Sequence, residues 1–389
     1  MKLLAVAGEI DGFLAGIRLR RPLQALCDAE GWPLTLRSLH EVGRADLGAA
    51  DLLVVQRSFS ERAWRLQRAA RQRGLPVVYD IDDLLTDPPP HLSNQAALLA
   101  RQASLRRCLA EADVLAVSTA RLGRELLSDL GATPAATAPL PQTVVVPNCS
   151  LPLADETWPA AAGPGPVSLL FAASEHMACD HLYPALRRLQ AERGAGVQVV
   201  VVGPPAAAFA AAGVRVQCHG LMPRADFLAL VRGLSRPLAV IPLEDSRFAA
   251  CKSAIKWFDY AEIGVPVLCS AVSPYREVVA DGVTGRLVAN DDEAWFLALQ
   301  QAVDDDGWRV RAALAARRVV RERHTLAQTV AAWREALTLA QARRAAHPLP
   351  APSLGWRLRE TVSAALEGGA LRLRQLNRAR LARRQARSR

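Results

Sequence analysis

The chain has 389 residues, a net charge of +10, 51% hydrophobic and 22% charged residues. At roughly 100–200 residues per domain this length predicts two domains with an extension, and the composition excludes a largely disordered chain. A membrane span and a signal peptide are not expected, because the apolar runs are short or interrupted and residues 3–7 are soon followed by Glu9 and Asp11.

The first part of the chain alternates between strand and helix patterns. Short apolar strands are predicted at 3–7, 52–55, 75–79, 114–117 and 143–146, and helices at 18–30 and 61–73. Such alternation predicts parallel βαβ topology. We therefore expect a Rossmann-like domain over residues 1–150, followed by a linker over 151–165 that is rich in Pro, Ala and Gly.

The alternation restarts after the linker. Strands are predicted at 167–172, 197–202, 214–218, 238–242, 266–270 and 285–288, with a helix at 179–193. The second Rossmann-like domain is expected over 166–325, and a helix over 326–347 is expected to return to the first domain. Two doubly wound units predict an α/β fold in which strand ends face a shared cleft.

The basic excess lies mostly in the tail, residues 348–389. Between Leu354 and Arg389 there are ten arginines against two glutamates. A basic tail can attract an anionic membrane surface or nucleic acid, and a solvated, partly helical extension is an equally good interpretation. The seven cysteines are odd in number and contain no Cys-x-x-Cys pair, which favours a reducing cytoplasm over a disulfide framework.

The lysines are more informative than the arginines. Lys2, Lys252 and Lys256 are the only lysines among 48 basic residues. A helix expected to start near Lys252 would present free N–H groups, the ammonium and the Ser253 hydroxyl to a phosphate. On that helix Lys256 and Asp259 would share the face of Lys252, and the Asp259 carboxylate could accept hydrogen bonds from a ribose. The alternative is a surface ion pair between Lys256 and Asp259.

The same segment resembles a known family. Residues 252–270, KSAIKWFDYAEIGVPVLCS, are similar to the C-terminal motif of GT4-like glycosyltransferases (glycosyl transferases group 1), and 274–288 and 144–148 resemble two further motifs of that family. The resemblance implies the GT-B fold, with a nucleotide sugar bound by the second domain and the acceptor by the first. It also implies retention of anomeric configuration, with neither metal nor cofactor.

The family resemblance assigns further residues. The family carries two acids eight positions apart, and Asp259 takes the place of the second acid while Cys251 stands at the first. Backbone around Ser273, Tyr275 and Glu277 is expected to approach the donor. The Lys-Ser form of the motif resembles a branch found in bacterial envelope and polysaccharide synthesis.

Two other segments are candidates for the site. Ser174 and His176 follow the first strand of the second domain, where His176 could contact the diphosphate; a helix cap by Ser174 with an exposed histidine is the alternative. Asp80-Ile81-Asp82 would bind a metal in a different glycosyltransferase class. Here Asp82 or Asp83 is instead expected to bind acceptor hydroxyls or act as a base, with helix capping as the alternative.

The loop after the first strand is a candidate for the acceptor. Gly12 and Gly16 are followed by Arg18, which could recognise an anionic acceptor such as a lipid-linked diphosphate. A complete GxGxxG motif is absent, so the glycines alone are a weak signal.

These observations predict a cytoplasmic, retaining, metal-independent glycosyltransferase that moves a sugar from a nucleotide-diphosphate sugar to a glycan or lipid-linked acceptor. Peripheral attachment to the inner membrane would use the tail. One alternative is a catalytically inactive sugar-nucleotide binding protein, motivated by Cys251. The other is a nucleic-acid or membrane-binding protein that acts through the tail, and of these partners nucleic acid is the less expected.

Overall fold

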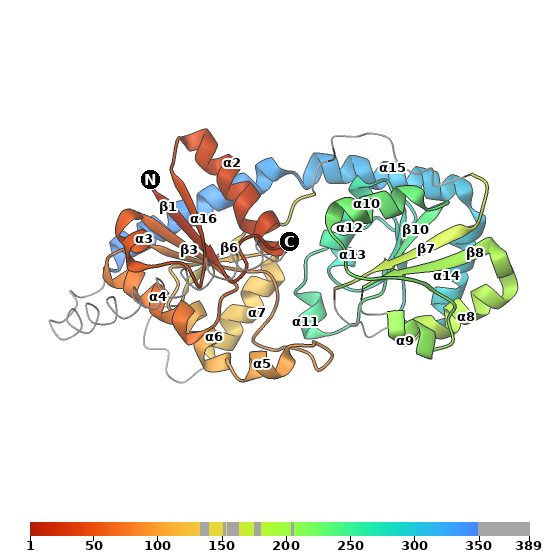
Figure 1. The fold of residues 1–389 in the computed structure, drawn as a ribbon, viewed down its shortest axis with the longest axis horizontal. Coiled ribbons are helices and arrows are strands. Elements are labelled where there is room, and N and C mark those ends of the chain that lie inside the picture. The colour runs from red at the N-terminus through yellow and green to blue at the C-terminus, as the bar shows by residue number, and fades with distance from the viewer. Residues whose placement is uncertain (133–139, 151–152, 154–162, 175–179, 204–205, 349–389) are drawn as a thin grey trace, which may run out of the picture.

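The structure is a computed structural model that describes residues 1–132, 140–150, 153, 163–174, 180–203 and 206–348. Two α/β domains lie side by side in it, and a pair of long helices runs over both (Figure 1). Each domain is built on a parallel sheet of six strands.

The N-terminal sheet has the order β2-β1-β3-β4-β5-β6. Its strands are β1 (Leu3–Ala7), β2 (Leu34–Ser38), β3 (Leu52–Gln56), β4 (Val77–Ile81), β5 (Val114–Val117) and β6 (Gln142–Val145). The helical segments are α1 (Phe13–Ala15), the π-helix η1 (Gly16–Arg20), α2 (Arg21–Glu30), α3 (Arg44–Ala49), α4 (Glu61–Gln72), α5 (Gln95–Leu99), α6 (Gln102–Ala110) and α7 (Ala120–Gly131). Strands β1, β3, β4 and β5 are buried along their whole length, as expected for a parallel sheet covered on both faces.

The C-terminal sheet has the order β12-β11-β10-β7-β8-β9. Its strands are β7 (Val167–Ala172), β8 (Val197–Val202), β9 (Gln217–His219), β10 (Pro237–Ile241), β11 (Val267–Ser270) and β12 (Arg286–Val288). The helical segments are α8 (Leu182–Arg193), the 3-10 helix η2 (Gly194–Gly196), α9 (Ala206–Ala211), α10 (Arg224–Gly233), α11 (Arg247–Ala250), α12 (Ile255–Glu262), α13 (Tyr275–Val278), α14 (Asp292–Asp304), α15 (Asp306–Arg323) and α16 (Leu326–Ala346). The predicted fold class, two Rossmann-like domains with a helical C-terminal extension, is confirmed.

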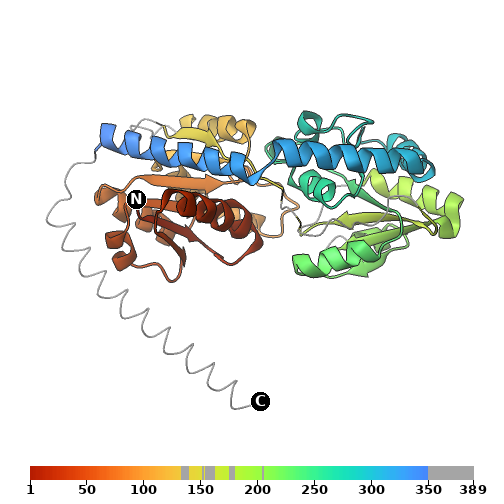
Figure 2. The ribbon, with the colours of Figure 1, turned by 90° about the horizontal axis from the view of Figure 1, so that it is seen from above.

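Helices α15 and α16 connect the two domains along one side of the molecule (Figure 2). Helix α15 packs on α12 of the C-terminal domain, whereas α16 crosses to the N-terminal domain and packs on α2. Trp333 of α16 is fully buried there, and its indole N–H donates to the Arg18 carbonyl at 3.0 Å. Among the described residues, no helix is long and apolar enough to cross a membrane.

One strand was not predicted. Strand β2, Leu34–Ser38, lies at the edge of its sheet and is mostly half-buried. A strand in this position does not need to be apolar along its whole length. Its sequence, LTLRS, lacks the continuous apolar run that identified the central strands, and for this reason it was not predicted.

Trp333→Ala should lower the free energy of unfolding by about 3–5 kcal/mol, because it leaves a large cavity under α16 and removes a buried hydrogen bond. Urea unfolding followed by circular dichroism would measure this loss. Glu335→Ala, on the exposed side of the same helix, is the control and should change stability by less than about 0.5 kcal/mol. Equal effects of the two substitutions would contradict the docking of α16 through Trp333.

Candidate active site

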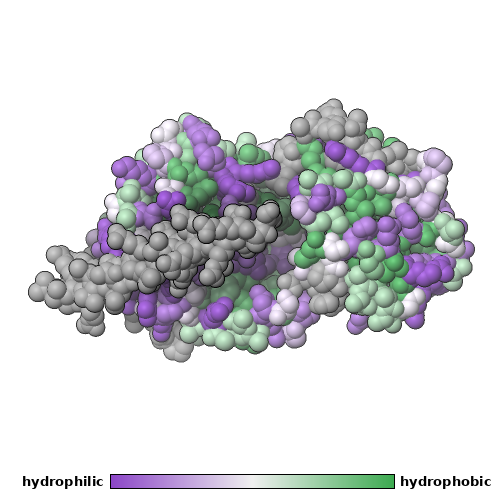
Figure 3. Space-filling view, viewed as in Figure 1, coloured by the Kyte–Doolittle hydropathy of each residue, from purple (hydrophilic) through white to green (hydrophobic). Residues whose placement is uncertain are grey.

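The candidate site lies where the two domains meet. Arg57 follows β3 and Asp82 and Asp83 follow β4, so these three residues stand at the C-terminal edge of the N-terminal sheet. Lys252 stands opposite them, in the segment that follows the C-terminal end of β10. The space-filling view shows the molecule hollowed between the two domains (Figure 3). Ligands of doubly wound sheets bind at this edge.

The short helix α11 joins the C-terminal domain to the other domain. The Ser246 hydroxyl caps it by accepting a hydrogen bond from the Ala249 N–H. Phe248 and Cys251 are then buried in the hydrophobic core of the N-terminal domain, and the Thr119 hydroxyl donates to the Cys251 carbonyl at 2.9 Å. The backbone on either side of Lys252 is therefore fixed by the opposite domain.

Arg247 reinforces this docking. Its guanidinium forms ion pairs with Glu125 at 2.7 Å and Asp129 at 2.6 Å, both on α7, and with Asp87 at 3.3 Å. These ion pairs raise the pKa of Arg247, mainly through the hydrogen bond to Asp129. The three carboxylates all belong to the N-terminal domain, so Arg247 holds the two domains together beside the candidate site.

Lys252 reaches across the domain boundary. Its Nζ lies 3.0 Å from the Asp83 Oδ1 and 4.5 Å from the centre of the Phe248 ring. The helix expected to start near Lys252 is α12, which starts at Ile255, whereas the cap at Ser246 begins a separate turn before Lys252. Lys252 therefore does not share a helix face with Lys256 and Asp259. Its side chain nevertheless faces the interdomain site.

Arg57 and the two aspartates form a charge network with Lys252. The Arg57 Nη1 lies 2.8 Å from the Asp82 carboxylate and 3.0 Å from the Asp83 carboxylate. Burial alone would raise the pKa of Asp83, but Lys252 and Arg57 lower it to about 2. Burial raises the pKa of Asp82, against the attraction of Arg57. At neutral pH Asp83 is thus a firmly ionised carboxylate beside Lys252.

Arg57 was missed by the sequence analysis. It has a left-handed backbone, with φ of 40°, and its N–H donates to the Asp80 carbonyl at 2.9 Å. Such a conformation is uncommon for a residue other than glycine, and it aims the side chain at the residues that follow β4. Its place directly after the buried strand β3 was the only sequence signal that could have identified it.

Arg18 is buried beneath the site instead of facing a ligand. It is 1% exposed, and its guanidinium pairs with Asp80 at 2.6 Å and donates to the Val146 carbonyl at 3.1 Å. The prediction that Arg18 binds an anionic acceptor is therefore wrong. Asp80 also accepts from Gln56 at 3.0 Å and is fully buried, so the Asp80-Ile81-Asp82 sequence does not present two carboxylates to one metal ion.

A hydrogen-bonded path leads from Arg18 to the other domain. Its Nη1 donates to the Asn148 Oδ1 at 2.9 Å, and the Asn148 Nδ2 donates to the Ser253 hydroxyl at 2.7 Å. Ser253 thus lies at the boundary beside Lys252, as a binding role would require. Because Asn148 belongs to the last described segment before the linker, this path ties the site to the connection between the domains.

Asp259 lies on α12 and pairs with an arginine that the sequence analysis did not consider. The Arg224 Nη1, at the start of α10, lies 3.0 Å from the Asp259 Oδ1. Burial raises the pKa of Asp259, and Arg224 opposes this shift. Arg224 is a partner of Asp259 that the alternative interpretation, a surface ion pair between Lys256 and Asp259, did not include. Lys256 itself is half-buried in the first turn of α12.

The buried side of helix α12 is fixed by contacts within the C-terminal domain. Trp257 is fully buried, and its indole N–H donates to the Thr284 carbonyl at 3.0 Å. Phe258 stacks on His324 with ring centres 4.1 Å apart. Glu262, also fully buried, pairs with Arg321 of α15 at 2.9 Å. The orientation of Lys256 and Asp259 is therefore fixed by the core of the C-terminal domain.

The segment after β11 lies beside α11. The Ser273 hydroxyl donates to the Glu277 carboxylate at 2.6 Å, and Ser273 also lies 3.2 Å from the Ala250 carbonyl of α11. The Tyr275 side chain is 3% exposed and packs in the core. The predicted approach of this segment to the donor is by its backbone and stays a prediction. Cys251 is fully buried, and burial raises the pKa of its thiol to about 11, so it supplies no charge at the site.

The remaining candidates are spread around the boundary. Ser174 is exposed just after β7, and His176 lies outside the described residues. Gly12 precedes α1 and accepts a backbone hydrogen bond from the Gly16 N–H at 2.9 Å. The loop around Gly12 follows β1 and so stands at the same edge of the sheet as Asp82.

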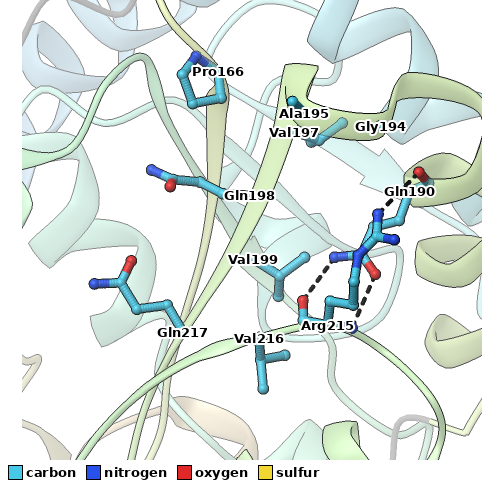
Figure 4. A pocket seen from close by; sticks show the side chains of 10 residues that line it. All are labelled: Pro166, Gln190, Gly194, Ala195, Val197, Gln198, Val199, Arg215, Val216 and Gln217. Carbon is cyan, nitrogen blue, oxygen red and sulfur yellow. Dashed lines mark hydrogen bonds between the residues drawn. The ribbon is translucent and has the colours of Figure 1, made fainter.

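A cavity of about 550 Å³ lies elsewhere, in the C-terminal domain. Figure 4 shows Gln190 and Arg215 bonded to each other in its wall, with the Gln190 Nε2 donating to the Arg215 carbonyl at 2.7 Å. It is lined by the first residues of β8, from Val197, and so opens at the N-terminal edge of the sheet. Ligands of such sheets bind at the opposite edge, so this cavity is separate from the candidate site.

Metal ligands do not gather in the part of the chain that the structure describes. Within it, no group of three or more His, Cys, Asp or Glu side chains could hold a metal ion. The charged groups at the boundary are paired with basic side chains instead.

The two facing Rossmann-like domains define the class. The fold is similar to that of sucrose-phosphate synthase from Thermosynechococcus elongatus, with a TM-score of 0.63, 16% identity and coverage of 89% of this chain and 100% of that one. HepE from Anabaena, solved with UDP, gives a TM-score of 0.54 at 14% identity, covering 87% and 100% of the two chains. The lipopolysaccharide outer core galactosyltransferase WaaB gives 0.55 at 11% identity, covering 87% and 99%. The fold is therefore the predicted GT-B fold.

Residues 167–305 match the family model described as Glycosyl transferases group 1. The predicted family resemblance is thus confirmed over the C-terminal domain, and this match supports a glycosyltransferase with the GT-B fold. No curated protein matches the sequence.

Asp80→Asn should lower the free energy of unfolding by about 3–5 kcal/mol, because it leaves the buried Arg18 charge uncompensated. Urea unfolding would measure the loss. Asp28→Asn is the matched control, since Asp28 is exposed and accepts only a local hydrogen bond from Gln24. A loss under 1 kcal/mol for Asp80→Asn would show that Arg18 is solvated and available to a ligand.

Proposed function

We propose that this glycosyltransferase takes its sugar from a nucleotide-diphosphate sugar, with retention of configuration and without a metal ion. The observation that carries the proposal is the position of Lys252, whose Nζ lies between the two domains, 3.0 Å from Asp83. A compact ammonium group at the C-terminal edges of two Rossmann-like sheets is well placed for a diphosphate.

The donor would lie along α12. Lys252 and Ser253 would bind the diphosphate, with Lys256 in the first turn of the helix beside it. Asp259 would accept hydrogen bonds from the ribose hydroxyls, and Arg224 would keep that carboxylate ionised. The structures of Anabaena HepE with UDP and with UDP-glucose support a uridine nucleotide as the first donor to test.

The acceptor would approach from the N-terminal domain. Asp82 and Asp83 are carboxylates that can accept hydrogen bonds from sugar hydroxyls, and Arg57 orients both. A glycan or a lipid-linked acceptor in bacterial envelope or polysaccharide synthesis fits these groups. The likeness in fold to a lipopolysaccharide galactosyltransferase agrees with this class of acceptor.

Catalysis would rest on positive charge. As the bond between the sugar and the diphosphate breaks, negative charge develops on the leaving phosphate, and Lys252 and Lys256 would stabilise it. Asp83 would leave the Lys252 ammonium when the diphosphate binds, which makes its carboxylate available to the acceptor. Burial of the reacting groups between the domains would limit hydrolysis of the donor.

A second function is favoured by Cys251. This residue stands where the family carries its first acid, and it is buried in the core of the N-terminal domain. A protein that binds a sugar nucleotide without transferring the sugar would have the same Lys252 site. Mass spectrometry of a nucleotide sugar incubated with the protein and a panel of acceptors separates the two functions, because tight binding without transfer or hydrolysis favours the inactive protein.

Lys252→Ala should weaken the binding of UDP or GDP by roughly 10- to 100-fold, since it removes one charge-assisted hydrogen bond to the diphosphate. Isothermal titration calorimetry would measure the affinity. Lys2→Ala is the matched control, because Lys2 is exposed at the start of β1, on the opposite edge of its sheet. Equal affinities for the two variants would remove Lys252 from the site, and failure of the parent protein to bind any nucleoside diphosphate would refute the donor class.

Asp83→Asn should strengthen the binding of the same nucleotide by about 10-fold, because the diphosphate no longer competes with a carboxylate for Lys252. Asp82→Asn is the control, since Asp82 contacts Arg57 and not Lys252. Weaker binding in Asp83→Asn than in Asp82→Asn would contradict the proposed exchange and indicate that Asp83 orients Lys252 for the ligand.

A further inference from the structure

Glu277 carries a carboxylate that no basic side chain neutralises within the part of the chain that the structure describes. The residue is exposed and belongs to the short helix α13, which follows β11 at the C-terminal edge of the second sheet. The carboxylates of Asp82, Asp83 and Asp259 differ, because each of them pairs with an arginine or a lysine. Glu277 therefore keeps an oxygen that a neutral hydroxyl group can use as its acceptor.

One hydroxyl group connects Glu277 to α11. The Ser273 hydroxyl donates to the Glu277 Oε1 at 2.6 Å and lies 3.2 Å from the Ala250 carbonyl oxygen. Ala250 is the last residue of α11 and precedes Lys252 by two positions. Figure 1 shows α11, α12 and α13 on the side of the C-terminal domain that is nearest to the N-terminal domain. The Glu277 carboxylate is therefore close to the backbone that carries Lys252.

The core keeps the Glu277 side chain pointing outward. Tyr275 and Val279 are buried, at 3% and 6% exposure, and the Val279 N–H donates to the Tyr275 carbonyl at 2.9 Å. Residues four positions apart share one face of a helical turn, so Glu277, midway between them, lies on the opposite face. The fold thus holds this carboxylate outside the core, beside α11.

The position next to Ala250 supplies no acceptor of this kind. Cys251 is fully buried in the core of the N-terminal domain. Asp83 belongs to the N-terminal domain and is already paired with Lys252 at 3.0 Å. A hydrogen bond from a hydroxyl group to a carboxylate is stronger than one to a neutral oxygen. Glu277 can provide that stronger hydrogen bond from the same domain as Lys252.

We propose that the Glu277 side chain binds a hydroxyl group of the donor sugar and that Ser273 is its positioning residue. This role rests on the proposed function, because it takes the diphosphate to be bound at Lys252. The sugar attached to that diphosphate would lie beside Ala250 and Ser273. The Glu277 Oε2 would accept a hydrogen bond from one sugar hydroxyl, while the Ser273 hydroxyl holds the Oε1.

The role of Glu277 bears on the choice between an active enzyme and an inactive binding protein. The inactive alternative is motivated by Cys251, which stands where the family carries its first acid. A carboxylate supplied by α13 would recognise the sugar without an acid at position 251. Such a protein distinguishes a sugar nucleotide from the bare diphosphate, and this difference in affinity can be measured.

The test uses the full chain and isothermal titration calorimetry with UDP-glucose, UDP-galactose, UDP-N-acetylglucosamine and GDP-mannose, together with UDP and GDP. For the sugar nucleotide that the parent protein binds best, Glu277→Gln should lower the affinity about 10-fold, because a hydrogen bond to a charged group is lost. The affinity for the matching diphosphate should change less than about twofold, since that ligand lacks the sugar. An unchanged affinity for the diphosphate also shows that the variant is folded.

Two further variants separate a binding role from a local structural one. Ser273→Ala should lower the affinity for the sugar nucleotide by roughly threefold and leave that for the diphosphate unchanged, because the carboxylate remains but loses one orienting hydrogen bond. Glu322→Gln is the matched control and should change neither affinity. Glu322 is an exposed glutamate of α15 that likewise accepts a hydrogen bond from a residue four positions earlier, Arg318, at 2.9 Å.

The proposal is overturned if Glu277→Gln leaves the ratio of the two affinities unchanged, whether both affinities stay the same or both fall equally. In that case binding of the diphosphate that depends on Lys252 would still support the proposed function. A parent protein that binds none of these nucleotides would instead refute the proposed function, and the role of Glu277 with it. The affinity of the parent for the bare diphosphate therefore distinguishes the two failures.

Discussion

The insertion of α11 into the opposite domain is the contact on which the candidate site depends. Phe248 and Cys251 belong to the C-terminal domain by sequence, yet they are buried in the core of the N-terminal domain. Removing these apolar groups from water favours the docked arrangement, and Arg247 adds ion pairs at the same place. Lys252 is thereby held against Asp83. The same burial explains why a thiol at position 251 cannot act as the family's first acid.

Charge pairing organises the site in two layers. Beneath it, Arg18 and Asp80 form a buried pair whose hydrogen bonds extend through Asn148 to Ser253 in the other domain. At the boundary, Arg57 and Lys252 neutralise Asp82 and Asp83. An ion pair in the lower layer is costly to break because it is shielded from water, whereas the upper layer is partly solvated and can exchange partners with a ligand. This difference separates structural arginines from binding residues.

The motif between residues 252 and 270 located the site correctly but gave the wrong local structure. The spacing of Lys252, Lys256 and Asp259 suggested a single helix. Instead, Ser246 caps the separate short helix α11, which ends at Ala250, and α12 begins at Ile255. The predicted single helix and the observed pair of helices both place Lys252 at the boundary between the domains. The prediction for Arg18 was wrong for another reason. A basic residue after a loop that contains glycines can either bind an anionic ligand at the surface or form a buried ion pair, and the sequence does not distinguish the two.

The sequence alone determined the two α/β domains and the family resemblance of the second, because buried strands and a local motif can be recognised from residues that are adjacent in the sequence. It could not determine which charges face each other. Lys252 and Asp83 are separated by 169 positions, and Arg18 and Asp80 by 62. Such pairs form only when the strand order and the docking of α11 bring distant chain segments together, and neither is encoded in a local period. The tertiary structure therefore decided that Arg57 belongs to the site while Arg18 and Tyr275 support it from within the core.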